Sequence, residues 1–264
     1  MVISVKKTGL VVILLIVLAL QMVLTFVLCV RQLSKDVSLI DYTIVIDAGH
    51  GGMDSGKVAT DGTRESDLNL QYAKTLGQMF DQSGFNVVYT RTNEGGLYGL
   101  PTKGFKLRDM QARKSIVQKC GANIVISIHM NQFGAQLSRK GPQVFYQKDF
   151  DEGQKLANAL QQTFNNHTGN NHECIAGDYY MCREMPCPSV IVECGFLSNA
   201  QDLARLKTDE YRQTLCNLIF SGVMNYLCTE WTLNSSQIWG LFSLSVVDLL
   251  FLLPNYGAIL HCVV

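Results

Sequence analysis

Between residues 41 and 228, short apolar segments rich in β-branched residues alternate with longer segments of helical period. Segments of the first kind predict strands at 42–48, 85–90, 123–128, 142–147 and 189–194, and those of the second kind predict helices at 66–80, 106–120, 153–164 and in two stretches between 200 and 227. Strands separated by helices of this length imply a sheet covered on both faces. The sequence therefore predicts an α/β fold of three layers, a central, mostly parallel sheet flanked by helices.

A long apolar segment precedes this region. Two lysines, Lys6 and Lys7, come before a run of 22 residues from 9 to 30, which as a helix would be roughly 33 Å long. A removable signal peptide is the alternative, but it has a shorter apolar core and small residues at its cleavage site. We therefore expect residues 1–31 to form an uncleaved transmembrane anchor with a cytoplasmic N-terminus. Residues 32–41 would then be a linker, and residues 42–228 a catalytic domain outside the cytoplasm.

The last segment, residues 229–264, is apolar and its role is open. Between residues 235 and 264 the only formal charge is that of Asp248. The apolar stretch is shorter than a full span and contains this aspartate, so a second transmembrane helix is disfavoured. A tail that covers a groove or binds a partner is one alternative, and a tail without a role is the other.

The composition argues against a nucleic-acid-binding protein, and the spacing of the cysteines argues against a zinc knot. The chain has 22 basic and 22 acidic residues and lacks the basic stripe of a nucleic-acid-binding protein. Nine cysteines are many for 264 residues, and four of them lie close together in sequence, namely Cys174, Cys182, Cys187 and Cys194. Their spacing lacks the two short pairs of a zinc knot, so we expect core thiols or one disulfide.

Polar, chemically capable residues lie where the predicted strands end. The first strand leads to His50, the third to His129 and the late strand to Glu193, while Glu65 lies just before the first helix. In open α/β sheets the carboxyl ends of parallel strands meet at one edge, and ligands bind there. We therefore expect these four side chains to share a site.

Two imidazoles and a carboxylate form a common set of ligands for catalytic zinc, because a fourth position stays open for water. A further carboxylate would take the proton of that water and pass it to a leaving amine, a role that fits Glu193. A structural role is the alternative for each histidine, and Asp47, Asp54 and Asp67 remain alternative ligands. His167 and His172, the other two histidines, are expected in a solvated loop.

Four segments, in this order, resemble motifs of the zinc-dependent N-acetylmuramoyl-L-alanine amidases known as amidase 3. They are IVIDAGHGGMDSG, RESDLNL, SIHMN and PSVIVECGFLSN. The resemblance implies zinc bound by His50, Glu65 and His129, with Glu193 as the catalytic carboxylate. It also implies hydrolysis of the amide between the lactyl group of N-acetylmuramic acid and L-alanine of the stem peptide. Met130 and Ser55 depart from the residues frequent at their positions, but neither is a ligand.

The arginines Arg91 and Arg113 also match the family pattern. We expect them to support the site structurally, with an ion pair at the surface as the alternative.

Residues 96–116, together with the predicted anchor, resemble the CwlD-type sporulation branch of this family. That resemblance implies removal of stem peptides from spore-cortex peptidoglycan as a step towards the muramic-δ-lactam needed for germination. The alternatives are a general cell-wall amidase in turnover or cell separation, a zinc peptidase, and a membrane-tethered peptidoglycan-binding protein without activity. An activating protein partner that helps the site to hold its metal is a further expectation.

Overall fold

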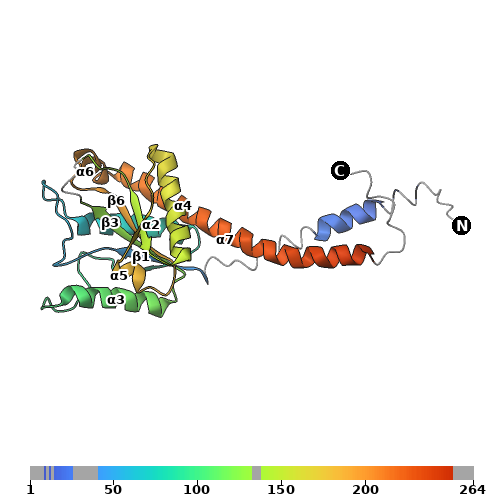
Figure 1. Ribbon diagram of the computed structural model, residues 1–264, viewed down its shortest axis with the longest axis horizontal. Coiled ribbons are helices and arrows are strands. Elements are labelled where there is room, and N and C mark those ends of the chain that lie inside the picture. Colours follow the sequence, from blue (N-terminus) through green and yellow to red (C-terminus); the bar gives the residue numbers. More distant parts are fainter. Residues whose placement is uncertain (1–8, 10–11, 13–14, 26–40, 133–137, 252–264) are drawn as a thin grey trace.

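A computed structural model describes residues 9, 12, 15–25, 41–132 and 138–251, the last 21 of these by their backbone alone. Its centre is a six-stranded sheet in the order β2-β1-β3-β6-β4-β5 (Figure 1). The strands are β1 (Thr43–Ala48), β2 (Asn86–Tyr89), β3 (Ile124–Asn131), β4 (Gln143–Gln147), β5 (Ile175–Gly177) and β6 (Ser189–Phe196). The helices are α2 (Glu65–Gln82), α3 (Phe105–Cys120), α4 (Asp151–Thr168), α5 (Tyr180–Arg183), α6 (Ala200–Leu206) and α7 (Asp209–Phe251). The mixed α/β fold with helices around a sheet is as predicted.

The register of the central strands places the predicted site residues at one edge. Strands β2, β1, β3 and β6 are parallel, so their carboxyl ends meet at the same edge. Asp47 of β1 lies opposite Ser127 of β3, and His129 of β3 lies opposite Glu193 of β6. Residues paired in this way in parallel strands point to the same face, so His129 and Glu193 share a face as well as an edge.

The two faces of the sheet carry different cores. One face packs on α2, α4 and α7 through a large apolar cluster that includes Ile46, Ile126, Leu76, Leu160 and Val223. The other face packs on α3 and α5 through a small cluster that includes Val45, Val125, Val117, Met181 and Cys187. Figure 1 shows α3 and α5 together on one side of the sheet and α4 and α7 on the other. The site residues His129 and Glu193 alternate with the large-core residues Ile128 and Val192, so they belong to the face with the small core.

The sheet differs from a fully parallel one at β4, which pairs antiparallel with β6 and parallel with β5. Only 11 residues connect β3 to β4, fewer than the dozen or more of a parallel crossover. The chain therefore turns back at the carboxyl ends of the parallel strands, and β4 runs in the opposite direction to β6. The helix α4 then provides the crossover that makes β5 parallel to β4. Sequence analysis did not predict β5 or α5, because three or four residues are too few to show a period.

The helix α7 is longer than the helical stretch predicted to end at 227. It continues through residue 251, and Figure 1 shows it projecting away from the sheet. Within the described ranges we find no helix whose length and apolar character would suffice for a bilayer crossing. Much of the predicted anchor, including residues 26–30, lies outside those ranges, as do the predicted linker from 32 to 40 and the tail after 251.

The buried cysteines of this segment are core thiols in three separate apolar clusters rather than ligands of a metal knot. Cys182, Cys187 and Cys194 are buried and free, and burial raises the pKa of the first two thiols to about 12. Of all the residues with described side chains, one set of three or more potential ligands converges, and it contains no cysteine. The expectation of core thiols holds for these three residues.

Candidate metal centre

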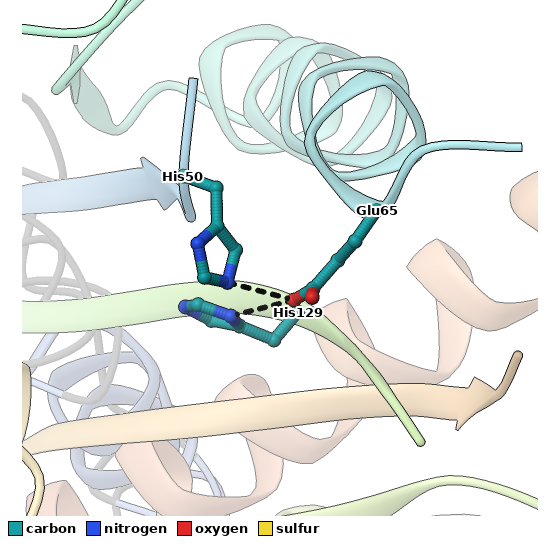
Figure 2. Close-up of side chains that lie close together, drawn as sticks. All are labelled: His50, Glu65 and His129. Atoms are coloured by element: carbon teal, nitrogen blue, oxygen red, sulfur yellow. Dashed lines mark hydrogen bonds and ion pairs between the residues drawn. The ribbon is translucent and has the colours of Figure 1, made fainter. Parts of the chain in front are cut away.

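Three side chains from distant parts of the chain converge at the carboxyl edge of the sheet (Figure 2). His50 follows β1, Glu65 is the first residue of α2, and His129 lies near the end of β3. Glu65 Oε1 lies 3.1 Å from His50 Nε2 and 2.9 Å from His129 Nδ1. One ligand atom from each residue lies within 4.8 Å of the other two. These are three of the four residues that the sequence placed at this edge.

The backbone holds His50 in an unusual conformation. Its φ is 60°, a left-handed value that costs a residue with a side chain about 1–2 kcal/mol. The flanking contacts fix this bend, because the Gly49 amide donates to the Ile128 carbonyl (3.1 Å) and the His50 carbonyl accepts from Arg113 (2.6 Å). Gly49 must lack a side chain, since a Cβ there would lie 2.2 Å from the His129 ring. The glycine thus brings the β1 loop against the second histidine.

Glu65 is buried and held from several sides. Its Oε2 accepts from the Lys57 amide at 2.7 Å, and its Oε1 accepts from the Met130 amide at 3.2 Å. Burial raises the pKa of this carboxyl, but the hydrogen bonds and charges of His129 and His50 outweigh burial and hold the pKa well below its usual range. Glu65 is therefore an anion that two imidazoles face.

Asp54 supports His50 from the side opposite Glu65. Its Oδ2 lies 2.9 Å from His50 Nδ1, and its Oδ1 pairs with Lys106 Nζ at 3.1 Å. Burial opposes protonation of His50, but the hydrogen bonds to Asp54 and Glu65 raise its pKa to about 9 in the absence of metal. A neutral His50 that donates through Nδ1 to Asp54 keeps the Nε2 lone pair towards Glu65, as in metal sites where a carboxylate orients a ligating histidine. Asp54 was an alternative ligand in the prediction, but in the structure it is the hydrogen-bond partner of the ligand His50 and does not belong to the converging set.

The other two aspartates left open as ligands also have different partners. Asp47 is fully buried and is bound by Arg113, Ser127 and Thr90, and its pKa falls to about 2 because these groups outweigh the effect of burial. Asp67 accepts from the hydroxyl of Ser66 at 3.2 Å and does not belong to the converging set.

The predicted supporting arginines lie inside the molecule, beneath the bend. Arg113 donates to the carbonyls of Ala48 and His50, and Arg91 donates to the carbonyls of Ala48 and Gly49. Both side chains are buried, so the alternative of an ion pair at the surface is wrong. Together they tie the end of β1 to its neighbours and thereby fix the position of His50.

Glu193 lies beside the converging triad without belonging to it. Its Oε2 is buried and has no hydrogen-bond partner among the residues that the structure describes. Burial is the largest influence and raises the pKa of Glu193 to about 7, although the neighbouring His129 lowers it. An unpartnered buried carboxyl with a pKa near neutrality suits a group that accepts and then donates a proton.

A cleft of about 250 Å³ opens next to the two histidines, between α3 and α5. Its lining combines the polar residues of the sheet edge with apolar and aromatic residues of both helices. They are Asp47, Gly49, His50, Asp54, Lys106, Met110, His129, Tyr179, Tyr180, Met181 and Ile191. Lys106 and the tyrosines were not among the predicted site residues, since only the approach of α3 and α5 places them at the site. His167 and His172 do not belong to it: His167 is exposed in the last turn of α4 rather than in a loop, and His172 is half-buried near the Lys140 carbonyl (3.2 Å).

The donor set fits a zinc ion. Two imidazole nitrogens and one carboxylate oxygen face a common point, which is the ligand set of catalytic zinc with an open fourth position. The second nitrogen of His50 is held by Asp54, and Glu65 is kept anionic. The Oε2 of Glu193, on the strand next to His129, is a buried polar atom near this point.

Comparison with known proteins agrees with this geometry. The model of the N-acetylmuramoyl-L-alanine amidase family matches residues 44–225. The germination-specific N-acetylmuramoyl-L-alanine amidase of Bacillus subtilis is 30% identical over 189 residues, which are 69% of this chain and 78% of that protein. The uncharacterised protein YqiI of the same bacterium is 30% identical over 187 residues, 70% of this chain and 84% of that protein. Among solved structures, the CwlD amidase of Clostridioides difficile, in complex with the GerS lipoprotein, is 33% identical with a TM-score of 0.68, covering 71% of this chain and 99% of that one.

Proposed function

Because this chain belongs to the N-acetylmuramoyl-L-alanine amidase family and is a cell-wall hydrolase of that activity, we propose that His50, Glu65 and His129 bind the zinc ion of the reaction and that Glu193 transfers its protons. The observation that carries the proposal is the convergence of three ligand atoms within 4.8 Å beside a buried, unpartnered carboxyl oxygen. The bond cleaved is the amide between the lactyl carbonyl of N-acetylmuramic acid and the nitrogen of L-alanine.

The residues divide the chemistry among them. Zinc, when bound, supplies a Lewis acid that activates water and offsets negative charge on the carbonyl oxygen. Glu193 takes a proton from the attacking water and returns it to the alanine nitrogen as the carbon–nitrogen bond breaks. Asp54 fixes the orientation of His50, while Arg91 and Arg113 hold the loop that carries it. The products are a free lactyl carboxylate and a stem peptide with a free amino terminus.

Two measurements test the metal and the reaction together. Protein supplied with excess zinc should bind about one zinc ion per chain by elemental analysis, and a chelator should abolish turnover. Mass spectrometry of treated muropeptides should show intact stem peptides that begin with the free amine of L-alanine. Shorter peptide fragments would identify a peptidase instead, and binding without products would identify a peptidoglycan-binding protein.

The biological setting that we propose is the spore cortex. Support comes from the resemblance of residues 96–116 to the CwlD-type sporulation branch, from the germination-specific relative, and from the similarity to the CwlD amidase. In that setting the enzyme exposes muramic residues for a second, deacetylating enzyme that allows muramic-δ-lactam to close. Expression in a spore former that lacks its germination amidase should restore lactam in the cortex and germination of the spores. Failure there, with activity on vegetative walls, would favour the alternative of wall turnover or cell separation.

A protein partner is part of the same proposal. The similar CwlD structure is that of a complex with a lipoprotein. In this chain the left-handed conformation of His50 costs free energy, so a partner that stabilises this loop would raise zinc affinity. The zinc content of the isolated protein decides the point, since a full complement without any partner would contradict the idea.

We also propose that the catalytic domain, residues 42–228, acts outside the cytoplasm on an anchor formed by residues 1–31, with residues 32–41 as the linker. The support is the apolar run of 22 residues behind Lys6 and Lys7. Protease added to intact cells should remove the catalytic domain, and washing with salt should not release it.

The role of residues 229–264 is tested by truncation after Glu230, which keeps the pair between Glu230 and Lys155 (3.4 Å). Unchanged activity and solubility would indicate a tail without a role.

A further inference from the structure

The cleft beside the histidines has one wall from α3 and one from α5, the two helices on the same side of the sheet in Figure 1. A pair between Lys114 of α3 and Glu184 just after α5 (2.7 Å) joins the two walls. Most of the lining is apolar or aromatic, with Met110 on one wall and Tyr180 and Met181 on the other. A cleft of this kind suits a short peptide with small side chains, such as one that begins with alanine.

The charges in the cleft are arranged unevenly. Asp47 and Asp54 are carboxylates that would repel an anionic substrate, and Asp47 is already neutralised by Arg113. Among the described residues that line the cleft, Lys106 is the one lysine or arginine. A substrate carboxylate that enters here therefore has Lys106 as its favourable position.

Lys106 is placed to bind two anions at once. Its Nζ lies 3.1 Å from Asp54 Oδ1, and its side chain remains 68% exposed. A lysine ammonium has three N–H donors, so one donor on Asp54 leaves two for another acceptor. The contact with Asp54 also limits the freedom of a flexible side chain, which lowers the entropy lost when a substrate binds.

We propose that Lys106 recognises the carboxylate on the second residue of the stem peptide, and that the peptide leaves the reacting bond along the cleft between α3 and α5. This inference rests on the proposed function and adds to it a direction for the substrate and a residue that determines specificity. The second stem residue of peptidoglycan is acidic, and its α-carboxyl occurs either free or as a primary amide. Lys106 distinguishes the two forms, because only the free carboxylate forms an ion pair with it.

The competing arrangement would use Lys57. This lysine lies near enough to Glu193 to lower its pKa, and it does not line the cleft between α3 and α5. If the peptide ran in that direction, Lys57 would meet its carboxylate and the sugar would occupy the cleft. The two arrangements therefore differ in which lysine, Lys106 or Lys57, gives the enzyme a preference for the free acid over the amide.

The experiment compares kcat/KM on soluble glycan chains whose stem peptides carry the second residue either as free acid or as amide. For the full-length protein loaded with zinc, we expect a preference for the free acid of roughly 2- to 5-fold, the range of an exposed ion pair. Lys106→Gln should bring the ratio to about 1, and Lys106→Glu should reverse it. The ratio is taken on one enzyme preparation, so any change in zinc content that the variants cause through Asp54 cancels.

The matched control is Lys103→Gln, an exposed lysine three residues earlier that does not line the cleft. It should keep the preference of the parent protein. The inference is overturned if the parent shows no preference, if the preference survives in Lys106→Gln, or if Lys57→Gln abolishes it instead. Cleavage of neither form would be a different result, since it would contradict the proposed function itself.

Discussion

The same strands form both faces of the sheet, but one face packs a large apolar core and the other carries the residues of the candidate metal centre. Towards α2, α4 and α7 the strands present only apolar residues, such as Ile46, Ile126 and Val192. Towards α3 and α5 the intervening positions hold Asp47, His129 and Glu193. Because side chains alternate along a strand, a dry core on one face fixes the position of every polar group on the other. The same strands can therefore contribute apolar residues to the core on one face and functional residues to the site on the other.

The polar face is held by directed bonds rather than by bulk packing. Arg113 is fully buried and binds Asp47 and Asp109 as well as the carbonyls of Ala48 and His50. A buried ion pair contributes little net stability, because desolvation of both partners offsets their attraction. Its effect here is positional, since it fixes the loop that carries His50.

The largest difference is expected between two neighbouring residues of β6. Glu193→Gln removes the proton acceptor on the polar face and should lower kcat at least a hundredfold, and up to about 10⁴-fold, with zinc still bound. Cys194→Ala, the next residue, points into the large core and should lower the free energy of unfolding without changing turnover. Rates and zinc content of both variants provide the measurement. Loss of zinc from Glu193→Gln would mean that Glu193 is a ligand.

The second comparison concerns stability. Arg113→Met leaves two buried carboxylates without their partner and should lower the free energy of unfolding by about 3–5 kcal/mol, together with zinc affinity. Leu76→Ala in the large core should cost about 2–5 kcal/mol and leave zinc affinity unchanged. Urea titrations and a competition with a chromophoric chelator measure the two quantities. Equal loss of zinc affinity in both variants would show that the faces are not independent.

The third prediction concerns the close approach of Gly49 to His129. Gly49→Ala places a methyl group 2.2 Å from the imidazole, so the ring must move and zinc affinity should fall about 10- to 100-fold. Gly95→Ala serves as the control, because the one atom within 4 Å of its new methyl group is Asn93 Oδ1, at 3.0 Å. Zinc affinity unchanged in Gly49→Ala would contradict the placement of His129 against this loop.

The smallest expected effect is a dependence of stability on pH that belongs to the polar face alone. The pKa of Asp47 is about 2 in the folded protein, below its ordinary value of 3.8, so the charged form stabilises the fold. This contribution, about 2 kcal/mol, is complete above about pH 5 and is lost as the pH falls towards 2. Urea midpoints between pH 5 and 2.5 should therefore fall less steeply in Asp47→Asn than in the parent. Leu76→Ala should retain the slope of the parent, and a slope unchanged in Asp47→Asn would refute the assignment.

Much of the fold was predictable because the large core imposes clear periods on the sequence. The strands around Ile46 and Ile126 and the helix around Leu76 are predicted within a few residues of their observed ends. The ends of three strands and the start of the first helix also predicted which polar residues lie together at one edge. These predictions depend on the local alternation of apolar and polar residues, which is clearest in the elements that pack against the large core.

The rest of the site depends on contacts between segments that carry no period. Asp54 was predicted only as one ligand among several alternatives, because nothing in the sequence shows that its partner is the outer nitrogen of His50. Lys106 and Tyr179 belong to the cleft only because α3 and the short α5 approach each other across the sheet edge. The antiparallel direction of β4 follows from the connection before it, which is too short for a parallel crossover.

The position of Glu65 as the first residue of α2 limits how this enzyme can vary. Successive residues of a helix differ by about 100° in direction, so inserting a single residue at the start of α2 would turn a different side chain towards the histidines. The loop that leads into the helix is free to change its length, provided that the helix itself does not slide along its axis. Homologues and designed variants should therefore accumulate insertions in the turn between residues 59 and 63 or after residue 82, while the helix from 65 to 82 keeps a constant phase.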